Sequence, residues 1–322
     1  MLRKSLVTLF SCLTLISTGA SWAQTYPNKP IRVIVPFGPG GPDALARMIG
    51  AQLGAQTGQA FVVENKPGAN GILGAEALAK SAPDGYTIMI TSSGFVAAPS
   101  VYKKLPYDTE KDFAPVTNLV ENPGIFVAVN PGVPARTLQE LIDLARKPDS
   151  KLSYGTPGVG NTLHLSGEFF NARAGTTILH IPYKGAGPAM VDVVGGHVQL
   201  LMDNIPSVQT NVSGGRLKVI GVTSAKRSGA MPNAPTFAES GLPGFEANSW
   251  WALLVPAATP RDIVARLNAE MLKVLQSAET REKFLGVGAE PAPGTPEEAN
   301  SHIRGEVAKW APIVKASGAR VD

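Results

Sequence analysis

Two glycine-rich loops carry the residues of this sequence that are best suited to bind a small anion. The first spans residues 36–43, between an apolar β-branched run at 31–35 and a segment with helical periodicity that starts at 44. This order predicts a strand, a loop and a helix N-terminus. Because the first N–H groups of a helix lack partners within it, such a loop favours an anion. The alternative is that its glycines only allow a tight turn.

A second loop, at residues 155–161, repeats this arrangement in the other half of the chain. It follows a predicted strand at 152–154 and precedes a predicted helix at 162–172. Loops at the carboxyl ends of parallel strands are where open α/β sheets bind ligands, so we expect the two loops to face each other across a cleft. A third candidate is the segment 91–94, where hydroxyl and N–H groups end a predicted strand; its alternative role is to cap a helix.

Polar side chains follow two further predicted strands of the second half. Tyr183 and Lys184 come after the strand at 178–180, where Tyr183 could pack on a ligand or donate to it. Lys184 could supply a counter-charge or lie in solvent. Asp203 ends the strand at 198–202, where its carboxylate could accept from a ligand or cap the turn before Pro206.

Catalytic motifs find little support in the sequence. The first loop has Asp43 where a dinucleotide-binding fingerprint needs its third glycine, and neither a Gly-Lys-Ser/Thr phosphate loop nor a Gly-x-Ser-x-Gly elbow occurs. None of the four histidines stands in a metal-ligand spacing, and His164 and Glu168 predict a local hydrogen bond rather than a metal site. We therefore expect no cofactor and no metal. A secreted serine hydrolase that uses Ser92 or Ser93 stays open as an alternative.

The elements that must position these loops alternate between strand and helix in two blocks, which is typical of doubly wound sheets. The first block has predicted strands at 31–35, 61–64 and 87–91 and helices at 44–56 and 74–80. Apolar runs at 113–120 and 125–129 predict a crossing into a second domain, and the run at 250–255 predicts the return.

The second block holds predicted helices at 138–146, 162–172 and 187–194 and strands at 152–154, 178–180, 198–202 and 217–222. Capping boxes are expected at Thr137 and Thr295. Thr259 and Pro260 predict the N-cap and first residue of another helix. The two C-terminal amphipathic helices are expected to cover the first domain.

The composition indicates a folded, exported protein. A chain of 322 residues with 44% hydrophobic and 17% charged residues can bury the cores of about two domains. Residues 1–23 combine a basic start, a short apolar stretch and small residues at 21 and 23, which is typical of a secretory signal. Cys12, the only cysteine, lies inside it. Export without disulfides favours the periplasm.

The charge balance argues against a nucleic-acid surface. Loss of the leader removes Arg3 and Lys4, so the 29 basic residues less two face 25 acidic ones and the formal net charge falls from +4 to +2. These charges are scattered along the chain rather than clustered.

Together these segments resemble the Bug family, the extracytoplasmic solute receptors of tripartite tricarboxylate transporters. The matching motifs span almost the whole mature chain in the family's order: Tyr26-Pro27-x-Lys29-Pro30-Ile31, Pro36-Phe37-x-Pro39-Gly40-Gly41, Val63-Glu64-Asn65-Lys66-Pro67-Gly68-Ala69, Pro83-Asp84-Gly85-Tyr86, Ile181-Pro182-Tyr183-Lys184-Gly185, and Pro235-Thr236 with Glu239-Ser240-Gly241. The first loop departs from the pattern, because Pro42 alone separates Gly41 from Asp43 where members usually have two residues.

The resemblance implies an α/β, two-domain periplasmic binding protein of the type II, Venus-flytrap kind, with two crossing strands and a central cleft that closes by a hinge motion. It implies a signal peptide at 1–23, a first domain at 24–121 and 246–322, and a second domain at 122–245. The implied function is not enzymatic: a monomer would bind a small aliphatic or aromatic carboxylate and deliver it to the large and small membrane subunits of the transporter. A binding protein that signals without transport is the alternative.

The same resemblance implies which residues bind the ligand. Carried over to this chain, they are Phe37, Gly38, Pro39, Gly40, Ser92, Ser93, Gly158, Val159, Gly160, Asn161, His164, Tyr183 and Asp203. Loop N–H groups, hydroxyls and ordered water would take the carboxylate oxygens. Hydrogen bonds to a charged group are strong enough that this recognition requires no arginine.

Overall fold

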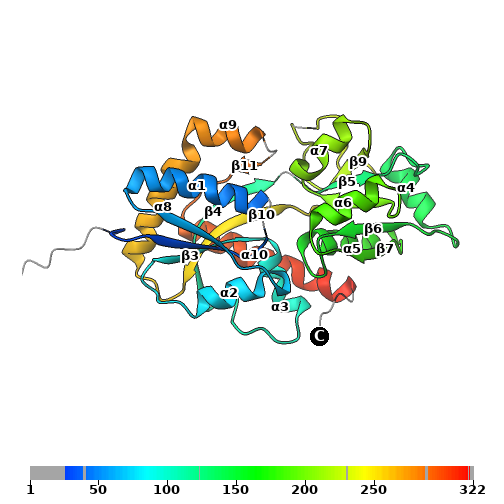
Figure 1. Cartoon of the computed structure of the whole chain (residues 1–322). Coiled ribbons are helices and arrows are strands. Elements are labelled where there is room, and N and C mark those ends of the chain that lie inside the picture. The colour runs from blue at the N-terminus through cyan, green and yellow to red at the C-terminus, as the bar shows by residue number, and fades with distance from the viewer. Residues whose placement is uncertain are drawn as a thin grey trace, which may run out of the picture.

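The structure is a computed structural model that describes residues 26–38, 41–122, 124–229, 231–286, 289–317 and 319. Its strands form two sheets, one of six strands and one of five, which lie in the two halves of the molecule in Figure 1. We call the half with the six-stranded sheet the first lobe and the other half the second lobe. The predicted signal peptide at 1–23 lies outside the described residues.

The first lobe contains the strand–helix alternation predicted for the N-terminal block. Its strands are β1 (Ile31–Val35), β2 (Phe61–Asn65), β3 (Thr87–Ser92), β4 (Phe113–Asn122), β10 (Ser249–Pro256) and β11 (Glu290–Pro291). They lie in the order β11-β4-β10-β3-β1-β2. β1 is parallel to β2 and β3, whereas β10 is antiparallel to β3 and β4.

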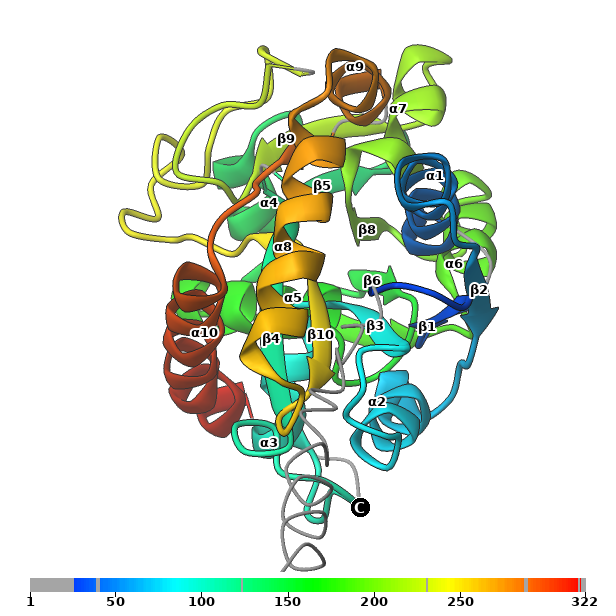
Figure 2. The ribbon, with the colours of Figure 1, turned by 90° about the vertical axis from the view of Figure 1, so that its left-hand side faces the viewer.

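Within the described residues, six helices and one 3-10 turn belong to the first lobe. They are α1 (Gly41–Thr57), η1 (Ala69–Gly71), α2 (Ile72–Ala79), α3 (Gly94–Val101), α8 (Arg261–Gln276), α9 (Ala278–Gly286) and α10 (Pro296–Ser317). Figure 2 looks onto the outer end of this lobe, where α8 stands in front of β4. None of the described helices is both long enough and apolar enough to span a membrane.

The second lobe repeats the alternation. Its strands are β5 (Phe126–Val129), β6 (Ser153–Thr156), β7 (Leu179–Pro182), β8 (Leu200–Asp203) and β9 (Lys218–Val222), in the order β7-β6-β8-β5-β9. β6 is parallel to β7 and β8, and β5 is antiparallel to β8 and β9. Its helices are α4 (Leu138–Ala145), α5 (Thr162–Ala174), α6 (Ala186–Val194) and α7 (Ile205–Ser213).

Alternate side chains of each strand fill cores on opposite faces of the sheets, as the two-residue period of a strand requires. In β1, Ile31 and Val33 pack with residues of α1 and α8, whereas Ile34 faces the other core. In β5, Val127 belongs to the same core as Ile34, and Phe126 faces a third core inside the second lobe. One buried apolar cluster therefore extends through both lobes.

The chain passes between the lobes at the two places that the sequence predicts. β4 of the first sheet is followed in sequence by β5 of the second sheet, and β10 belongs to the first sheet again. Thr223 joins the two crossings: its Oγ1 accepts from the Ile125 N–H at 2.7 Å and donates to the Ala247 carbonyl. Its own N–H donates to the Ile125 carbonyl at 3.0 Å. Thr223 is fully buried, so these bonds are shielded from water.

The helix ends agree with most of the sequence signals. The capping box at Thr137 is confirmed, because Glu140 N–H donates to Thr137 Oγ1 at 3.2 Å and the Glu140 carboxylate accepts in return. The box at Thr295 is confirmed in the same way by Glu298. The start of α8 was predicted one residue too early, since Pro260 has an extended ψ of 141° and is the N-cap rather than the first helical residue.

Three helices of the structure are not predicted from the sequence. They are α3, α7 and α9. α3 contains Pro99, and α7 has a proline in its first turn, where the missing N–H costs nothing. In α3 and α7, proline and the short length of the segment hide the helical periodicity, so packing rather than local propensity decides these two helices. α9 contains no proline, and its nine residues are too few to show a clear period.

α10 does more than cover the first domain. It contacts α3 and β4 of the first lobe and also α5 of the second lobe. Figure 1 shows its C-terminal part, in red, next to α5. The last long helix of the chain therefore ties the two lobes together, which its amphipathic pattern alone does not predict.

Glu306 on α10 is the acceptor for two buried indoles. Its Oε2 accepts from Nε1 of Trp250 and from Nε1 of Trp310, each at 3.1 Å, and its Oε1 accepts from Lys309 Nζ at 3.0 Å. Trp250, Trp310 and Glu306 are all buried. The Glu306 carboxylate thus connects α10 to the returning strand β10.

We expect the Glu306→Ala substitution to lower the free energy of unfolding by about 2–4 kcal/mol, because it leaves two buried indole N–H groups without an acceptor. Glu306→Gln, which keeps a carbonyl oxygen, should lose less. Denaturant titration measures both. Arg304→Gln, at an exposed position of the same helix, is the control and should change stability by less than about 0.5 kcal/mol. Equal stability of Glu306→Ala and the wild type would contradict this prediction.

Candidate ligand-binding site

The carboxyl end of β3 in the first lobe meets the start of α5 in the second. Ser93, which follows β3, shares a hydrogen bond of 2.6 Å between its Oγ and Oγ1 of Thr162, and both residues are buried. A methyl group added at Gly94 would lie 3.8 Å from Cα of Asn161. The candidate segments 91–94 and 155–161 are therefore in direct contact. Ser93 occupies the N-cap position of α3 but makes no side-chain capping bond there.

Three helix N-termini converge at this contact. α3 begins at Gly94, α5 begins at Thr162, and α2 follows directly on η1. Asn70 of η1 lies close to the other two: a methyl group added at Gly94, the first residue of α3, or at Gly160, just before α5, would lie 3.7 Å from Asn70 Nδ2. The N-terminal end of a helix carries a partial positive charge and N–H groups without partners in the helix. The junction of the two lobes therefore suits a negatively charged group.

The first loop lies beside η1 and α2. A methyl group added at Gly74 would lie 2.6 Å from Cβ of Pro36, and one at Gly71 would lie 3.4 Å from it. Any other residue type at position 74 would therefore keep α2 farther from the loop than glycine does. This contact brings the start of the first loop next to the segment that carries Asn70.

Asn65, at the end of β2, holds the first loop. Its Nδ2 donates to the Phe37 carbonyl at 3.0 Å, and its Oδ1 accepts from Arg47 at 3.0 Å. Arg47 also pairs with Asp43 at 2.9 Å, and this hydrogen-bonded pair lowers the pKa of Asp43 below its ordinary value. A methyl group added at Gly38 would meet nothing within 4 Å. Two further predicted ligands, Pro39 and Gly40, lie outside the described residues.

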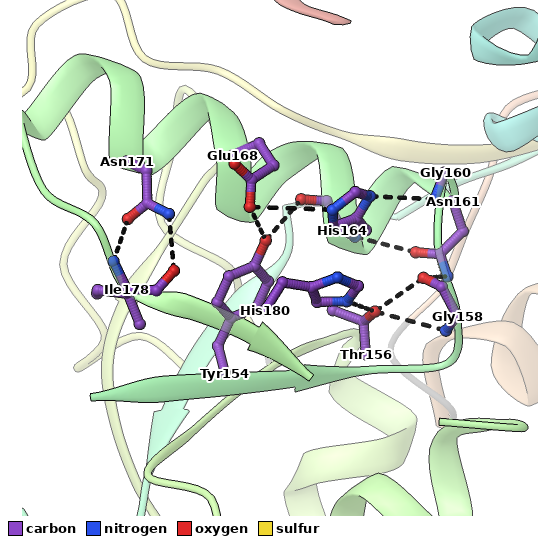
Figure 3. Close-up of polar contacts among 10 residues, drawn as sticks. All are labelled: Tyr154, Thr156, Gly158, Gly160, Asn161, His164, Glu168, Asn171, Ile178 and His180. Atoms are coloured by element: carbon purple, nitrogen blue, oxygen red, sulfur yellow. Dashed lines mark hydrogen bonds and ion pairs between the residues drawn. The ribbon is translucent and has the colours of Figure 1, made fainter. Parts of the chain in front are cut away.

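The second loop is held by its own hydrogen bonds, which Figure 3 shows. The Gly158 carbonyl accepts from Thr156 Oγ1 at 3.0 Å and from Asn161 Nδ2 at 2.9 Å. Asn161 Oδ1 caps α5 by accepting the His164 N–H at 3.0 Å. The Gly160 N–H donates to His164 Nδ1 at 3.0 Å. In this arrangement the Gly160 N–H, one of the predicted donors to a ligand, is engaged inside the protein.

His164 is buried beside the loop, in a cluster of polar side chains (Figure 3). Its ring stacks on His180 with centroids 3.9 Å apart, and His180 Nε2 lies 2.6 Å from Thr156 Oγ1. The predicted hydrogen bond between His164 and Glu168 does not form, because His164 Nε2 lies 3.9 Å from the Glu168 carboxylate. That carboxylate accepts instead from the Tyr154 hydroxyl at 2.6 Å. Among the described residues, no three His, Cys, Asp or Glu side chains are grouped to hold a metal.

Burial keeps both stacked histidines neutral. It lowers the pKa of His164 from 6.5 to about 4. It also lowers the pKa of His180 to about 3, with a smaller effect from the neighbouring His164. Since His164 Nδ1 accepts a hydrogen bond from the Gly160 N–H, that nitrogen carries no proton. The cluster therefore supports the loop without adding positive charge.

The remaining predicted ligands are three residues of the second lobe, Tyr183, Asp203 and Val159, and one of the first lobe, Ser92. The Tyr183 hydroxyl donates to Asp192 at 2.6 Å, and burial together with this bond raises the pKa of Tyr183 to about 12. Asp203 is buried at the end of β8, where its Oδ1 accepts from the Asn204 N–H at 2.7 Å. Val159 is 38% exposed at the tip of the second loop. Ser92 is partly exposed at the end of β3.

Several residues of the junction are missed by sequence reasoning. They are Asn65, Asn70, Thr156, Thr162 and His180. Asn70-Gly71 reads as a turn, and Thr162 reads as the first residue of a helix, so each has a local explanation. Only their three-dimensional contacts distinguish them: those of Asn70 and Thr162 cross between the lobes, whereas those of Asn65, Thr156 and His180 stay within one lobe.

The neutral state of His164 predicts a pH dependence of stability. Its pKa is about 4 in the folded protein and about 6.5 in the unfolded chain, so the unfolded chain binds the extra proton between these values. As the pH falls through that range, we expect proton binding to this histidine in the unfolded chain to lower the free energy of unfolding by about 3 kcal/mol. Denaturant titrations between about pH 7 and pH 4 should show a shallower decline for His164→Asn than for the wild type. Parallel pH profiles would contradict the prediction.

Comparisons with known proteins agree with this architecture. The sequence model of the tripartite tricarboxylate transporter family receptor matches residues 45–319. Protein BugT of Bordetella pertussis is 37% identical over 302 residues, which cover 93% of this chain and 92% of that protein.

Solved structures of similar proteins cover nearly the whole chain. Rpa4515 of R. palustris, solved with adipate, is 36% identical and superposes with a TM-score of 0.86 over 92% of this chain and 100% of its own. MatC (Rpa3494) of Rhodopseudomonas palustris, solved with bound malate, is 31% identical, with a TM-score of 0.82 over 90% of this chain and 100% of its own. The chain therefore belongs to the receptor family of the tripartite tricarboxylate transporters and has its two-domain α/β fold.

Proposed function

We propose that this protein is a periplasmic receptor that binds a small dicarboxylate between its lobes and delivers it to the membrane subunits of a tripartite tricarboxylate transporter. The observation that carries the proposal is the likeness, over at least 90% of the chain, to two proteins solved with adipate and with malate. Both acids are short and carry two carboxylate groups. The leader at 1–23 would direct export, and the receptor would act as a monomer.

The chemistry of the junction supports an anionic ligand. The polar groups gathered there are neutral donors: the hydroxyls of Ser93 and Thr162, the amide of Asn70 and the N–H groups that open α3 and α5. Donors of this kind bind carboxylate oxygens strongly once water is displaced. A micromolar receptor needs about −8 kcal/mol, which one or two buried carboxylates with some apolar contact can supply.

The ligand-binding residues remain proposals of the same kind. We infer that Gly38, Ser92, Ser93, Val159 and Asn161 contact the ligand, because they belong to the loops that flank the junction. Phe37, Pro39, Gly40, Gly158, Gly160, Tyr183 and Asp203 complete the proposed set. His164 would act indirectly, since its contact with Gly160 shapes the loop.

The domain boundaries and the hinge are also proposed. We place the first domain at 24–121 and 246–322 and the second at 122–245, a division that the strands of the two sheets support except at Asn122, the last residue of β4. Rotation about the crossings near Thr223 would open and close the site.

Contacts of Ser93, one of the two candidate nucleophiles, do not favour a serine hydrolase that uses this residue. The Ser93 hydroxyl pairs with Thr162, whereas His164 pairs with Gly160 and His180 with Thr156. A hydrolase would need a histidine within hydrogen-bond reach of the serine.

A thermal-shift screen of carboxylic acids tests the function. We expect adipate, malate or a related dicarboxylate to stabilise the mature chain by about 2.7 kcal/mol at a concentration of about 100 times its Kd. That gain corresponds to a rise in melting temperature of about 5 °C. Neutral diamides of the same acids serve as controls. No response to a broad panel of acids, or recovery of a hydrolysed ligand, would contradict the proposal. Uptake of the stabilising acid by a deletion strain separates transport from signalling.

Gly38 offers a test of the first loop. Because a methyl group at this position faces open space, Gly38→Ala should leave the free energy of unfolding within about 0.5 kcal/mol of wild type. It should lower the affinity for the stabilising acid at least about tenfold if the ligand occupies that space. Gly305→Ala, at an exposed position of α10 with nothing within 4 Å, is the matched control and should keep the affinity. Unchanged affinity of Gly38→Ala would remove Gly38 from the site.

A further inference from the structure

The side-chain amide of Asn70 is a buried donor without an acceptor. Its Nδ2 is shielded from solvent and has no hydrogen-bond partner among the residues that the structure describes. A primary amide nitrogen carries two N–H groups. A buried donor that stays unpaired destabilises a protein, so its presence calls for an explanation.

The backbone around Asn70 is also unfavourable. Ala69 has a φ of 44° and Asn70 a φ of 53°, both in the left-handed region, between Gly68 and Gly71, which also have positive φ. Side chains other than glycine are uncommon in this region, although asparagine tolerates it better than most. Two unfavourable features at one residue are typical of a functional site, where the rest of the fold holds the strained geometry in place.

The position of Asn70 relates it to both lobes. Its Nδ2 lies close to Gly94, at the start of α3, and to Gly160, in the second loop. Gly94 directly follows Ser93, whose hydroxyl pairs with Thr162. The unpaired amide therefore lies at the place where the helix N-termini of the two lobes meet.

We propose that the Asn70 amide donates a hydrogen bond to a carboxylate oxygen of the bound ligand, an inference that rests on the proposed function. In this structure Gly160 of the second loop lies beside the amide, so the ligand reaches the amide when that loop moves away from the first lobe. The carboxylate then accepts from Asn70 Nδ2 beside the Ser93 hydroxyl. Because this amide nitrogen can only donate, this end of the site selects an anionic oxygen and rejects an ammonium group.

Two variants and one control test the role of Asn70. Asn70→Gly removes the amide and suits the left-handed backbone. Asn70→Asp keeps the shape but replaces the donor by an anionic acceptor. Ala69→Gly, at the neighbouring left-handed residue, changes the backbone without touching the amide and is the matched control. Calorimetric titration with adipate and malate, or with the acid that stabilises the wild type most, gives the affinities.

We expect Asn70→Gly to lower the affinity about 10- to 100-fold, the range for a lost hydrogen bond to a charged group. Its melting temperature without ligand should stay level or rise, because a buried unpaired donor is removed. Asn70→Asp should lower the affinity further, since a carboxylate repels the ligand. Ala69→Gly should bind like the wild type.

Each other outcome overturns a definite part of the proposal. If the wild type binds an acid and Asn70→Gly binds it equally well, the inference about Asn70 is wrong and the proposed function stands. If Asn70→Gly loses affinity but its melting temperature also falls well below that of Ala69→Gly, Asn70 has a structural role and the inference is again wrong. If the wild type binds no acid of the panel, the proposed function fails and the inference fails with it.

Discussion

The hydrogen bonds of Thr223 are the constraint on which the arrangement of the two lobes depends. This buried residue connects Ile125 on the first crossing to Ala247 on the second, through its side chain and its backbone. The crossings fix which edge of each sheet faces the other lobe. As a result, Ser93 and Thr162, which are 69 residues apart in sequence, come within hydrogen-bond distance.

The junction that these crossings create is polar but almost uncharged. Hydroxyls, an amide and helix N-termini supply donors, and the nearby histidines stay neutral because burial lowers their pKa values. An anion would therefore be recognised by oriented dipoles rather than by an opposite charge. Oriented donors discriminate by direction, so a site of this kind can distinguish ligands of similar charge.

Support for the junction comes from residues that do not face it. Asn65 holds the first loop through the Phe37 carbonyl, and His164 holds the second loop through the Gly160 N–H. Farther away, α10 packs on both lobes and is anchored by Glu306 to Trp250 of β10. Any rotation of the lobes must accommodate the contact between α10 and α5.

The sequence by itself determined most of the elements and the family. Alternating apolar residues, turn glycines and capping boxes act over a few neighbouring residues, so β1, β3, the two crossings and the boxes at Thr137 and Thr295 follow from local patterns. α3 and α7, which contain prolines, were not predicted, because tertiary packing stabilises them although their helix propensity is low. Only the tertiary structure decided which polar groups meet: Ser93 pairs with Thr162 and Gly160 with His164, whereas Asn70 Nδ2 has no partner among the described residues. The physical reason is that a hydrogen bond between distant segments depends on how the whole chain packs, which no short stretch of sequence records.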